Sequence, residues 1–188
     1  MAVLVLAAGG SRRLGRPKQL VRMNGHPLLE LAVTRVMDLA PVWIGVVVGA
    51  GATRLEEVLR PFPVEVIRAR DWRSGMSVSL RAGLARVPRR ATHLLLTTVD
   101  QWAVTPLDLE RLLRQRGREP VAAAYEGILG SPALFPRRLW RLLGALEGDR
   151  GARALLAAPG VRAVAIDRAA FDLDTPDDLR RLRAVSRR

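Results

Sequence analysis

The sequence predicts an α/β fold in which a mainly parallel sheet is covered by helices on both faces. Apolar segments typical of strands alternate with amphipathic segments typical of helices along the 188 residues, which is the pattern of βαβ units. Two segments, 43–48 and 93–99, show continuous apolar runs rather than an alternating pattern, as expected for strands in the middle of a parallel sheet. Because the chain contains no linker or internal repeat, we expect a single domain over residues 1–188.

The predicted elements follow one another in the order that such a fold requires. Strands are predicted at 2–7, 43–48, 63–68, 93–99, 121–125 and 161–166. Helices are predicted at 27–39, 53–60, 77–86, 106–115, 137–146, 150–157 and 176–185. Sheets of this kind bind ligands beyond the carboxyl ends of their strands, which is where the loops at 7–18 and 99–102 would lie.

Local signals mark the start of two helices. Thr105 is a good N-cap, followed by a proline at the first helical position and by Asp108 at the third. Thr175 and Asp178 repeat this arrangement before the last helix. The acids of that helix start therefore have a structural explanation.

Composition excludes several classes of site and partner. The chain contains no cysteine, which excludes disulfides and thiolate metal sites. Its apolar runs are too short to span a bilayer and Met1 leads directly into a strand, so we expect a cytoplasmic protein without a membrane contact. The net charge is +13, but the arginines are scattered and one tyrosine and three phenylalanines offer little base stacking. We therefore expect anionic small-molecule substrates and no nucleic acid, a basic nucleic-acid-binding domain being the alternative.

The segment after the first strand is typical of a phosphate-binding loop. Residues 7–11 carry little side-chain bulk, so their N–H groups can approach phosphate oxygens. Lys18 is the single lysine among 31 basic residues. An ammonium is a compact charge whereas a guanidinium is a wide fork, so we expect Lys18 to contact a triphosphate. A tight strand-to-helix turn is the alternative, since the glycine spacing matches neither a P-loop nor a dinucleotide fingerprint.

Acidic residues at two places are candidate metal ligands. Asp100 follows the strand 93–99 and should emerge at the same sheet edge as the glycine loop. A carboxylate facing a triphosphate would hold Mg²⁺, which binds through one or two carboxylates and substrate phosphates. The alternative role of capping the next helix is already filled by Thr105. Asp172 and Asp174 precede the last helix cap and lack such an explanation.

Six positions of the glycine loop match a known signature: Ala8, Gly9, Ser11, Arg13, Gly15 and Lys18. The segment resembles Leu-Ala-Ala-Gly-x-Ser-x-Arg-Met-Gly-x-x-Lys, the signature of the MobA-like NTP transferases that activate sugars and cofactors. Leu14 replaces the methionine at nearly constant volume. The resemblance implies a Rossmann-like three-layer α/β/α nucleotidyltransferase fold. It also implies catalytic roles for Arg13 and Lys18 and nucleotide binding by Ala7, Ala8, Gly9, Gly10 and Ser11.

The resemblance extends to three further segments. Asp100 stands where the family has the metal-binding aspartate of Asp-Gln-Pro, although Trp102 replaces the proline and would reshape the acceptor pocket. Residues 172–178 resemble Asp-Ile-Asp-Thr-Pro-Glu-Asp, whose acidic pair closes the metal site, which implies Asp172 as the second Mg²⁺ ligand with Asp174 behind it. Residues 71–80 correspond to a segment that lies against the nucleoside. This implies nucleotide binding by Gly75, Ser77 and Ser79, helix capping by the serines being the alternative.

Two short motifs resemble the subgroup that attaches CMP to molybdopterin. That subgroup shows Gly-His-Pro and Gly-Asp-x-Gly-Ala-Arg; here residues 148–153 keep the second motif, whereas Ser131 replaces the histidine of the first. Ala8 stands where guanylyl-transferring relatives have glycine, and its methyl would narrow the room for a purine. The resemblance implies transfer of CMP from CTP to molybdenum–molybdopterin, with a molybdenum hydroxylase as recipient. The alternatives are a guanylyl or sugar-phosphate nucleotidyltransferase and a non-catalytic cofactor-binding accessory protein.

Overall fold

The computed structural model describes residues 1–149 and 151–186, over which the main sheet has seven strands in the order β5-β4-β1-β6-β8-β7-β9. Their bounds are β1 Ala2–Ala7, β4 Trp43–Val48, β5 Glu65–Arg68, β6 His93–Thr98, β7 Val121–Tyr125, β8 Ile128–Pro136 and β9 Arg162–Ala165. A small separate hairpin joins β2 (Arg22–Met23) to β3 (His26–Pro27). The predicted sheet is confirmed, and β5 begins two residues later than predicted.

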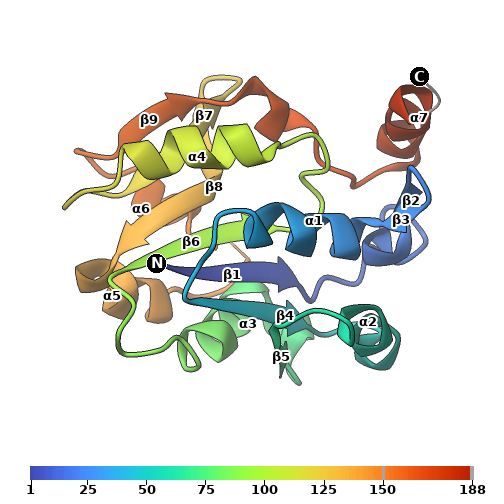
Figure 1. Ribbon diagram of the computed structural model, residues 1–188, viewed down its shortest axis with the longest axis horizontal. Helices are drawn as coiled ribbons and strands as arrows, with labels where there is room; N and C mark the ends of the chain where they lie inside the picture. Colours follow the sequence, from blue (N-terminus) through green and yellow to red (C-terminus); the bar gives the residue numbers. More distant parts are fainter. Residues whose placement is uncertain (150, 187–188) are drawn as a thin grey trace.

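Helices cover both faces of this sheet. Their bounds are α1 Leu28–Met37, α2 Ala52–Leu59, α3 Met76–Leu84, α4 Pro106–Arg114, α5 Trp140–Gly144, α6 Arg153–Leu156 and α7 Pro176–Val185. Figure 1 shows α1 and α4 in front of the sheet and α3 and α5 behind it. Buried side chains of α1, α2 and α4 belong to one hydrophobic cluster, and those of α3, α5 and α6 to another. These layers confirm the predicted α/β/α architecture.

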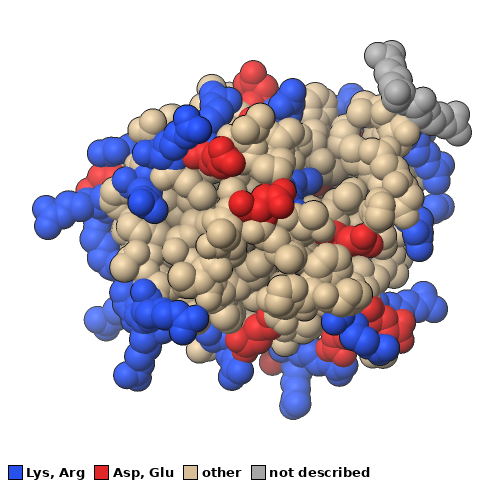
Figure 2. All heavy atoms as spheres, in the orientation of Figure 1, with Lys and Arg blue, Asp and Glu red and all other residues tan. Residues whose placement is uncertain are grey.

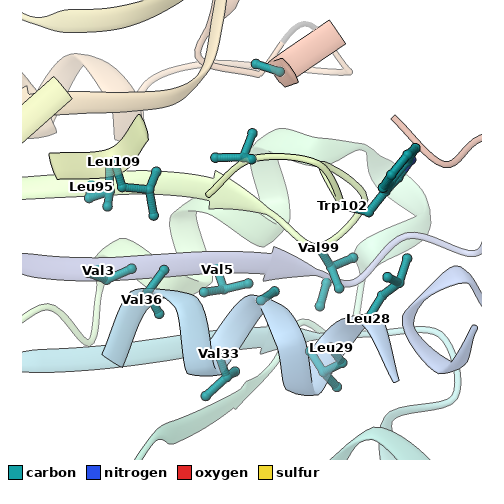
Figure 3. Close-up of a cluster of buried hydrophobic side chains, with 14 of the residues drawn as sticks. Val3, Val5, Leu28, Leu29, Val33, Val36, Leu95, Val99, Trp102 and Leu109 are labelled. Atoms are coloured by element: carbon teal, nitrogen blue, oxygen red, sulfur yellow. The ribbon is translucent and has the colours of Figure 1, made fainter. Parts of the chain in front are cut away.

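The first cluster fixes β1 against α1. Val3 and Val5 of β1 lie beside Val33 and Val36 of α1, and all four side chains are at most 1% exposed (Figure 3). A strand that is apolar at every position can pack on both faces, so the alternate residues of β1 fill the second cluster. This packing holds the end of β1, and therefore the start of the glycine loop, in place.

Strand direction brings the predicted loops together. Strands β1, β4, β5 and β6 are mutually parallel, so the loops after β1 and β6 leave the same edge of the sheet. Beyond that edge, Gln101 pairs with Asp172 in an isolated antiparallel bridge. The three segments expected to form the site therefore meet.

Strand β8 was not predicted. It runs antiparallel to both β6 and β7, and its Gly130 and Pro132 are residues that weaken the sequence signal of a strand. The register jumps between Ala122–Ala133 and Ala123–Gly130, so Ser131 and Pro132 form a bulge. Because a bulge needs no ladder hydrogen bond from proline, the strand tolerates it.

Two predicted helices are shorter than expected. The segment predicted at 137–146 divides into a 3₁₀ turn at Arg137–Leu139 and α5. The helix predicted at 150–157 is reduced to α6, and Arg150 lies outside the described residues. In the helices that the structure describes, none combines the length and apolar character needed to cross a membrane. Figure 2 shows basic side chains spread around one face of the molecule, with acidic groups among them.

Candidate active site

Gln19 shapes the glycine loop from the inside. Its side-chain amide donates to the carbonyl oxygens of Ala7 at 2.7 Å and Gly9 at 2.8 Å, and the residue is only 1% exposed. Ser11 has a φ of 50°, and its Oγ accepts a hydrogen bond from the Lys18 N–H at 3.1 Å. Ser11 therefore closes the loop rather than lining the pocket in front of it. Sequence reasoning missed Gln19, whose one signal was a polar side chain beside the lysine.

A pocket of about 280 Å³ lies in front of the loop. Eight residues predicted for the site line it: Ala7, Ala8, Gly9, Gly10, Lys18, Gly75, Ser79 and Asp100. Eight further lining residues were not predicted: Leu6, Arg12, Trp72, Arg73, Met76, Thr98, Val99 and Asp149. Trp72 packs so closely on Gly10 that a Cβ there would be 2.8 Å from its ring. We call this cavity the loop pocket.

Lys18 is held at the rim of the loop pocket by two carboxylates. Its Nζ donates to Asp100 Oδ2 at 2.5 Å and to Asp174 Oδ1 at 2.8 Å. Burial acts to lower the pKa of Lys18, but the charges of Asp100 and Asp174 outweigh it and raise the pKa above 10.5. Arg13 lies outside the loop pocket, where its Nη2 donates to Asp174 Oδ2 at 2.6 Å. Asp174, expected behind Asp172, is therefore the acid that contacts both predicted cations.

Asp172 has the properties of a cation ligand. Its Oδ1 is buried and has no hydrogen-bond partner among the residues that the structure describes. Burial raises the pKa of Asp172 to about 7, and the negative charges of Asp100 and Asp174 add to the rise. A buried carboxylate oxygen without a donor is costly unless a cation binds it. The donor chemistry of Asp100 and Asp172 thus fits Mg²⁺.

This arrangement is an open site rather than a closed metal cage. Within residues 1–149 and 151–186, no group of three acidic, histidine or cysteine side chains is placed to hold a metal by itself. Mg²⁺ commonly binds through one or two carboxylates and completes its coordination with substrate phosphates and water. The geometry therefore fits a metal that arrives with a nucleotide.

A second pocket, of about 620 Å³, adjoins the loop pocket. The two share five lining residues: Leu6, Met76, Thr98, Asp100 and Asp149. The second pocket also contains Asp172 and Asp174, and an apolar wall formed by Leu96, Ala133, Ala152, Ala154, Leu156 and Ala157. Its remaining polar lining is Gln101, Tyr125, Gly130, Ser131 and Arg153. Burial raises the pKa of Tyr125, Asp172 reinforces that rise, and Arg153 opposes it.

The loop that carries Asp100 is anchored on both sides. Gln101 Nε2 donates to the carbonyl oxygens of Ser131 at 2.6 Å and Ala169 at 3.1 Å. From α1, Arg35 donates to the carbonyls of Gln101 at 2.9 Å and Trp102 at 3.2 Å. Burial lowers the pKa of Arg35 to about 10, against the opposing charge of Asp108. These contacts fix the direction in which Asp100 leaves the sheet.

Trp102 does not reshape the acceptor pocket as expected. It is 8% exposed, packs against Phe171 with ring centroids 5.9 Å apart, and lines neither pocket. Its position after Gln101 turns the indole toward the hydrophobic cluster of α1 instead. The departure from the family pattern therefore affects packing beneath the site.

The start of α3 is capped from a distant segment. The Met76 N–H donates to Asp149 Oδ1 at 3.2 Å, and the Ser77 N–H donates to the Gly148 carbonyl at 3.1 Å. Neither serine of α3 caps the helix, and Ser77 is 1% exposed and lies outside both pockets. Met76 and Asp149 line both pockets and so lie where the two adjoin, whereas Ser77 lines neither of them.

A Rossmann-like sheet with a glycine loop, one lysine and paired carboxylates at its carboxyl edge defines the nucleotidyltransferase class. Residues 3–164 match the MobA-like NTP transferase domain, and the chain belongs to this family. The family resemblance drawn from the sequence is therefore confirmed.

Three similar proteins illustrate the range of the family. Molybdenum cofactor guanylyltransferase of Rhodobacter capsulatus is 30% identical over 96% of this chain and 94% of its own. Nicotine blue oxidoreductase of Paenarthrobacter nicotinovorans is 30% identical over 81% of this chain and 79% of its own. The crystal structure of Rv0371c from Mycobacterium tuberculosis in complex with manganese has a TM-score of 0.82 and 30% identity, covering 96% of each chain.

Proposed function

We propose that this chain transfers CMP from CTP to a phosphate of molybdenum–molybdopterin and releases pyrophosphate. One observation carries the proposal: Asp100, bonded to Lys18, lines both the loop pocket and the second pocket. A donor nucleotide in one pocket and an acceptor in the other would meet at this carboxylate. Nucleoside triphosphates are cytoplasmic substrates, so we also propose that residues 1–188 act there as one domain.

The proposed reaction is an in-line displacement at phosphorus. An oxygen of the acceptor phosphate attacks the α-phosphorus, the bond to the bridging oxygen of the β-phosphate breaks, and pyrophosphate leaves. The N–H groups of residues 8–10 bind phosphate oxygens, while Lys18 and Arg12 at the pocket rim neutralise charge that develops on the leaving group. Positioning and electrostatics supply the catalysis, without a covalent intermediate.

Asp100 and Asp172 would hold the divalent metal. Nucleotidyltransferases of this family typically use divalent metals, and the relative Rv0371c has been crystallised with manganese. The metal supplies charge neutralisation and orientation of the phosphates. We propose Mg²⁺, because the orphaned Oδ1 of Asp172 is a hard oxygen donor beside Asp100.

The second pocket supports a ring-shaped acceptor over a sugar phosphate. A sugar presents hydroxyls around its whole ring, and each one needs a hydrogen-bond partner when it is buried. The wall here is formed largely by alanine and leucine side chains, with polar groups gathered on the remaining side. Molybdopterin is a fused pterin whose polar groups lie at its aminopyrimidinone edge, its dithiolene and its phosphate, so a ring face can lie against this wall while the phosphate meets the polar lining.

The choice of CTP rests on Ala8. This residue lines the loop pocket and is 5% exposed. Its carbonyl accepts a hydrogen bond from the Ala50 N–H at 3.1 Å, which restrains the loop backbone from moving away from a larger base. The methyl group of Ala8 could favour CTP over the larger GTP by about 1–3 kcal/mol. Transfer of GMP is the alternative that the guanylyltransferase relative supports.

The test is to incubate the protein with Mg²⁺, molybdopterin and each of the four nucleoside triphosphates in turn. We expect pyrophosphate release with CTP at a higher rate than with GTP, ATP or UTP. An accessory protein would bind molybdopterin and release none, and a nucleic-acid-binding domain would instead show a strongly salt-dependent affinity for DNA. Preference for GTP would overturn the cytidylyl assignment, and delivery of the product to a molybdenum hydroxylase would identify the recipient.

A further inference from the structure

Tyr125 is the single tyrosine of the chain, and it lines the second pocket. It is the last residue of β7 and is only 8% exposed. Its hydroxyl lies directly over Gly130 of β8, where a Cβ would stand 2.3 Å from the phenolic oxygen. Gly130 is not among the glycines with positive φ. This glycine is therefore required by the close approach of the tyrosine hydroxyl rather than by its own backbone conformation.

The hydroxyl stands between charges of opposite sign. Burial and the negative charges of Asp172 and Asp100 raise the pKa of the hydroxyl, whereas the charge and hydrogen bond of the Arg153 guanidinium, at the start of α6, oppose that rise. A hydroxyl donor and a cation placed beside a metal-ligand pair are the groups that bind a phosphate monoester. Tyr125 thus lies where the second pocket approaches the reacting centre.

The other side-chain donors of this pocket are already engaged. Thr98 Oγ1 donates to Gln101 Oε1 at 3.3 Å, and Gln101 Nε2 donates to two backbone carbonyls. Ser131 Oγ donates to the Leu96 carbonyl at 3.4 Å. Arg153 and the Tyr125 hydroxyl interact with each other, and among the described residues of the pocket lining they are the side-chain donors that no other group of the protein engages.

We propose that the Tyr125 hydroxyl and the Arg153 guanidinium bind the phosphate group of the acceptor and hold it toward Asp100 and Asp172. This rests on the proposed function in one respect, that the acceptor is a phosphate monoester. Tyr125 is then a substrate contact, and Gly130 is a positioning residue that acts through it. The apolar wall opposite receives the ring to which the phosphate is attached.

The single tyrosine allows a binding test that does not depend on turnover. Protein labelled with ring-¹³C tyrosine gives one tyrosine ring signal, which is followed by NMR during titration with phenyl phosphate. We expect a saturable shift with phenyl phosphate and none with phenol, which lacks the phosphate. Arg153→Gln should raise the concentration needed for half-saturation at least ten-fold.

The control for this titration is Arg141→Gln. It removes the same charge from an exposed position of α5 that lines neither pocket, and it should titrate like the wild type. The proposal is overturned if the tyrosine signal does not shift with phenyl phosphate or shifts equally with phenol. It is also overturned if Arg153→Gln leaves the concentration for half-saturation unchanged. These outcomes hold even if the chain transfers no CMP.

Turnover provides the second readout. Tyr125→Phe keeps the ring and removes the hydroxyl, so KM for molybdopterin should rise about ten- to hundred-fold while KM for CTP stays unchanged. Gly130→Ala should act in the same way, because its methyl group displaces the hydroxyl at the tip of a side chain without filling the core. Equal changes in both KM values, or none, would refute the role of Tyr125. Wild-type protein that releases no pyrophosphate would refute the proposed function alone.

Discussion

Replacing Lys18 by methionine should destabilise the metal-free protein. The substitution keeps the length of the side chain but removes the ammonium that bonds Asp100 at 2.5 Å and Asp174 at 2.8 Å. Asp172 lies close enough for its pKa to respond to these charges, so three acidic residues would lose their shared cation. Lys18 and Asp100 side chains are 12% and 16% exposed, whereas that of Asp174 is 34% exposed and better hydrated.

These exposures set the expected magnitude. Removing one partner of a buried ion pair costs about 3–5 kcal/mol, whereas an exposed pair contributes about 0–1 kcal/mol. The Lys18 cluster is intermediate in exposure, so we expect Lys18→Met to lower the free energy of unfolding by about 2–3 kcal/mol. A domain of this size loses about 2–4 °C in Tm for each kcal/mol, so the expected loss is about 4–12 °C. Millimolar Mg²⁺ should recover part of it, because the metal replaces the missing positive charge.

Lys18→Arg separates charge from shape. The guanidinium keeps the positive charge, so the variant should melt near the wild type, but a planar fork cannot replace a compact ammonium that bonds both Asp100 and Asp174. Loss of one preorganised charge contact typically lowers kcat about a hundred- to thousand-fold. We therefore expect Lys18→Arg to fold normally and to release pyrophosphate at least about a hundred-fold more slowly.

The assay combines calorimetry in EDTA and in Mg²⁺ with pyrophosphate release. Arg54→Met on α2 is the matched control, because it removes a cation from an exposed position outside both pockets. If Lys18→Met melts like this control in EDTA, the ammonium does not offset carboxylate repulsion. Near wild-type turnover in Lys18→Arg would show that charge alone suffices and that the argument from shape is wrong.

Three further predictions test other parts of the site. Asp100→Asn should abolish turnover with a nearly unchanged Tm; an unfolded variant would mark Asp100 as structural. The pKa of Asp172 is raised from 3.8 to about 7, so between these values the folded protein holds a proton that the unfolded chain has lost, and stability falls as pH rises through that window. Asp172→Asn should therefore be more stable than wild type in EDTA, by on the order of 1–3 kcal/mol above pH 7 and by little at pH 4; parallel pH curves would contradict this. Ala8→Gly should raise GTP use about tens-fold with little loss of CTP use, and an unchanged GTP:CTP ratio of rates would remove Ala8 from base selection.

The sequence predicted the parts of the fold that local patterns determine. Continuous apolar runs marked β1, β4 and β6, and capping boxes marked α4 and α7, where Thr105 and Thr175 indeed bond their aspartates. Strand β8 was not predicted because its bulge contains Pro132, and proline is excluded from a regular hydrogen-bonded ladder. Such a bulge depends on register with β7, which no local pattern encodes.

The site was predictable as a set of segments but not in every side chain. The glycine loop and Asp100 lie where the strand order places them. Which arginine of the loop faces the pocket depends on the turn at Ser11, with its φ of 50°, and the structure turns Arg12 inward and Arg13 outward to Asp174. The motif at 148–153 includes Asp149, but its contact with Met76, 73 residues away, has no local signal. Contacts of this kind follow from tertiary packing.

The positive net charge of the molecule contrasts with the acidic residues at its candidate site. A net charge of +13 attracts anions of every kind to the surface, but Asp100, Asp172 and Asp174 surround Lys18 where the two pockets meet. A triphosphate in the loop pocket would lie beside Asp100 and Asp149, with Asp172 and Asp174 in the adjoining pocket, so carboxylate repulsion would oppose entry of a metal-free nucleotide. A triphosphate that carries a divalent cation presents the positive charge that the Asp172 oxygen lacks. We therefore expect the positive exterior to favour encounter with anions and the acidic centre to favour a nucleotide that carries a divalent cation.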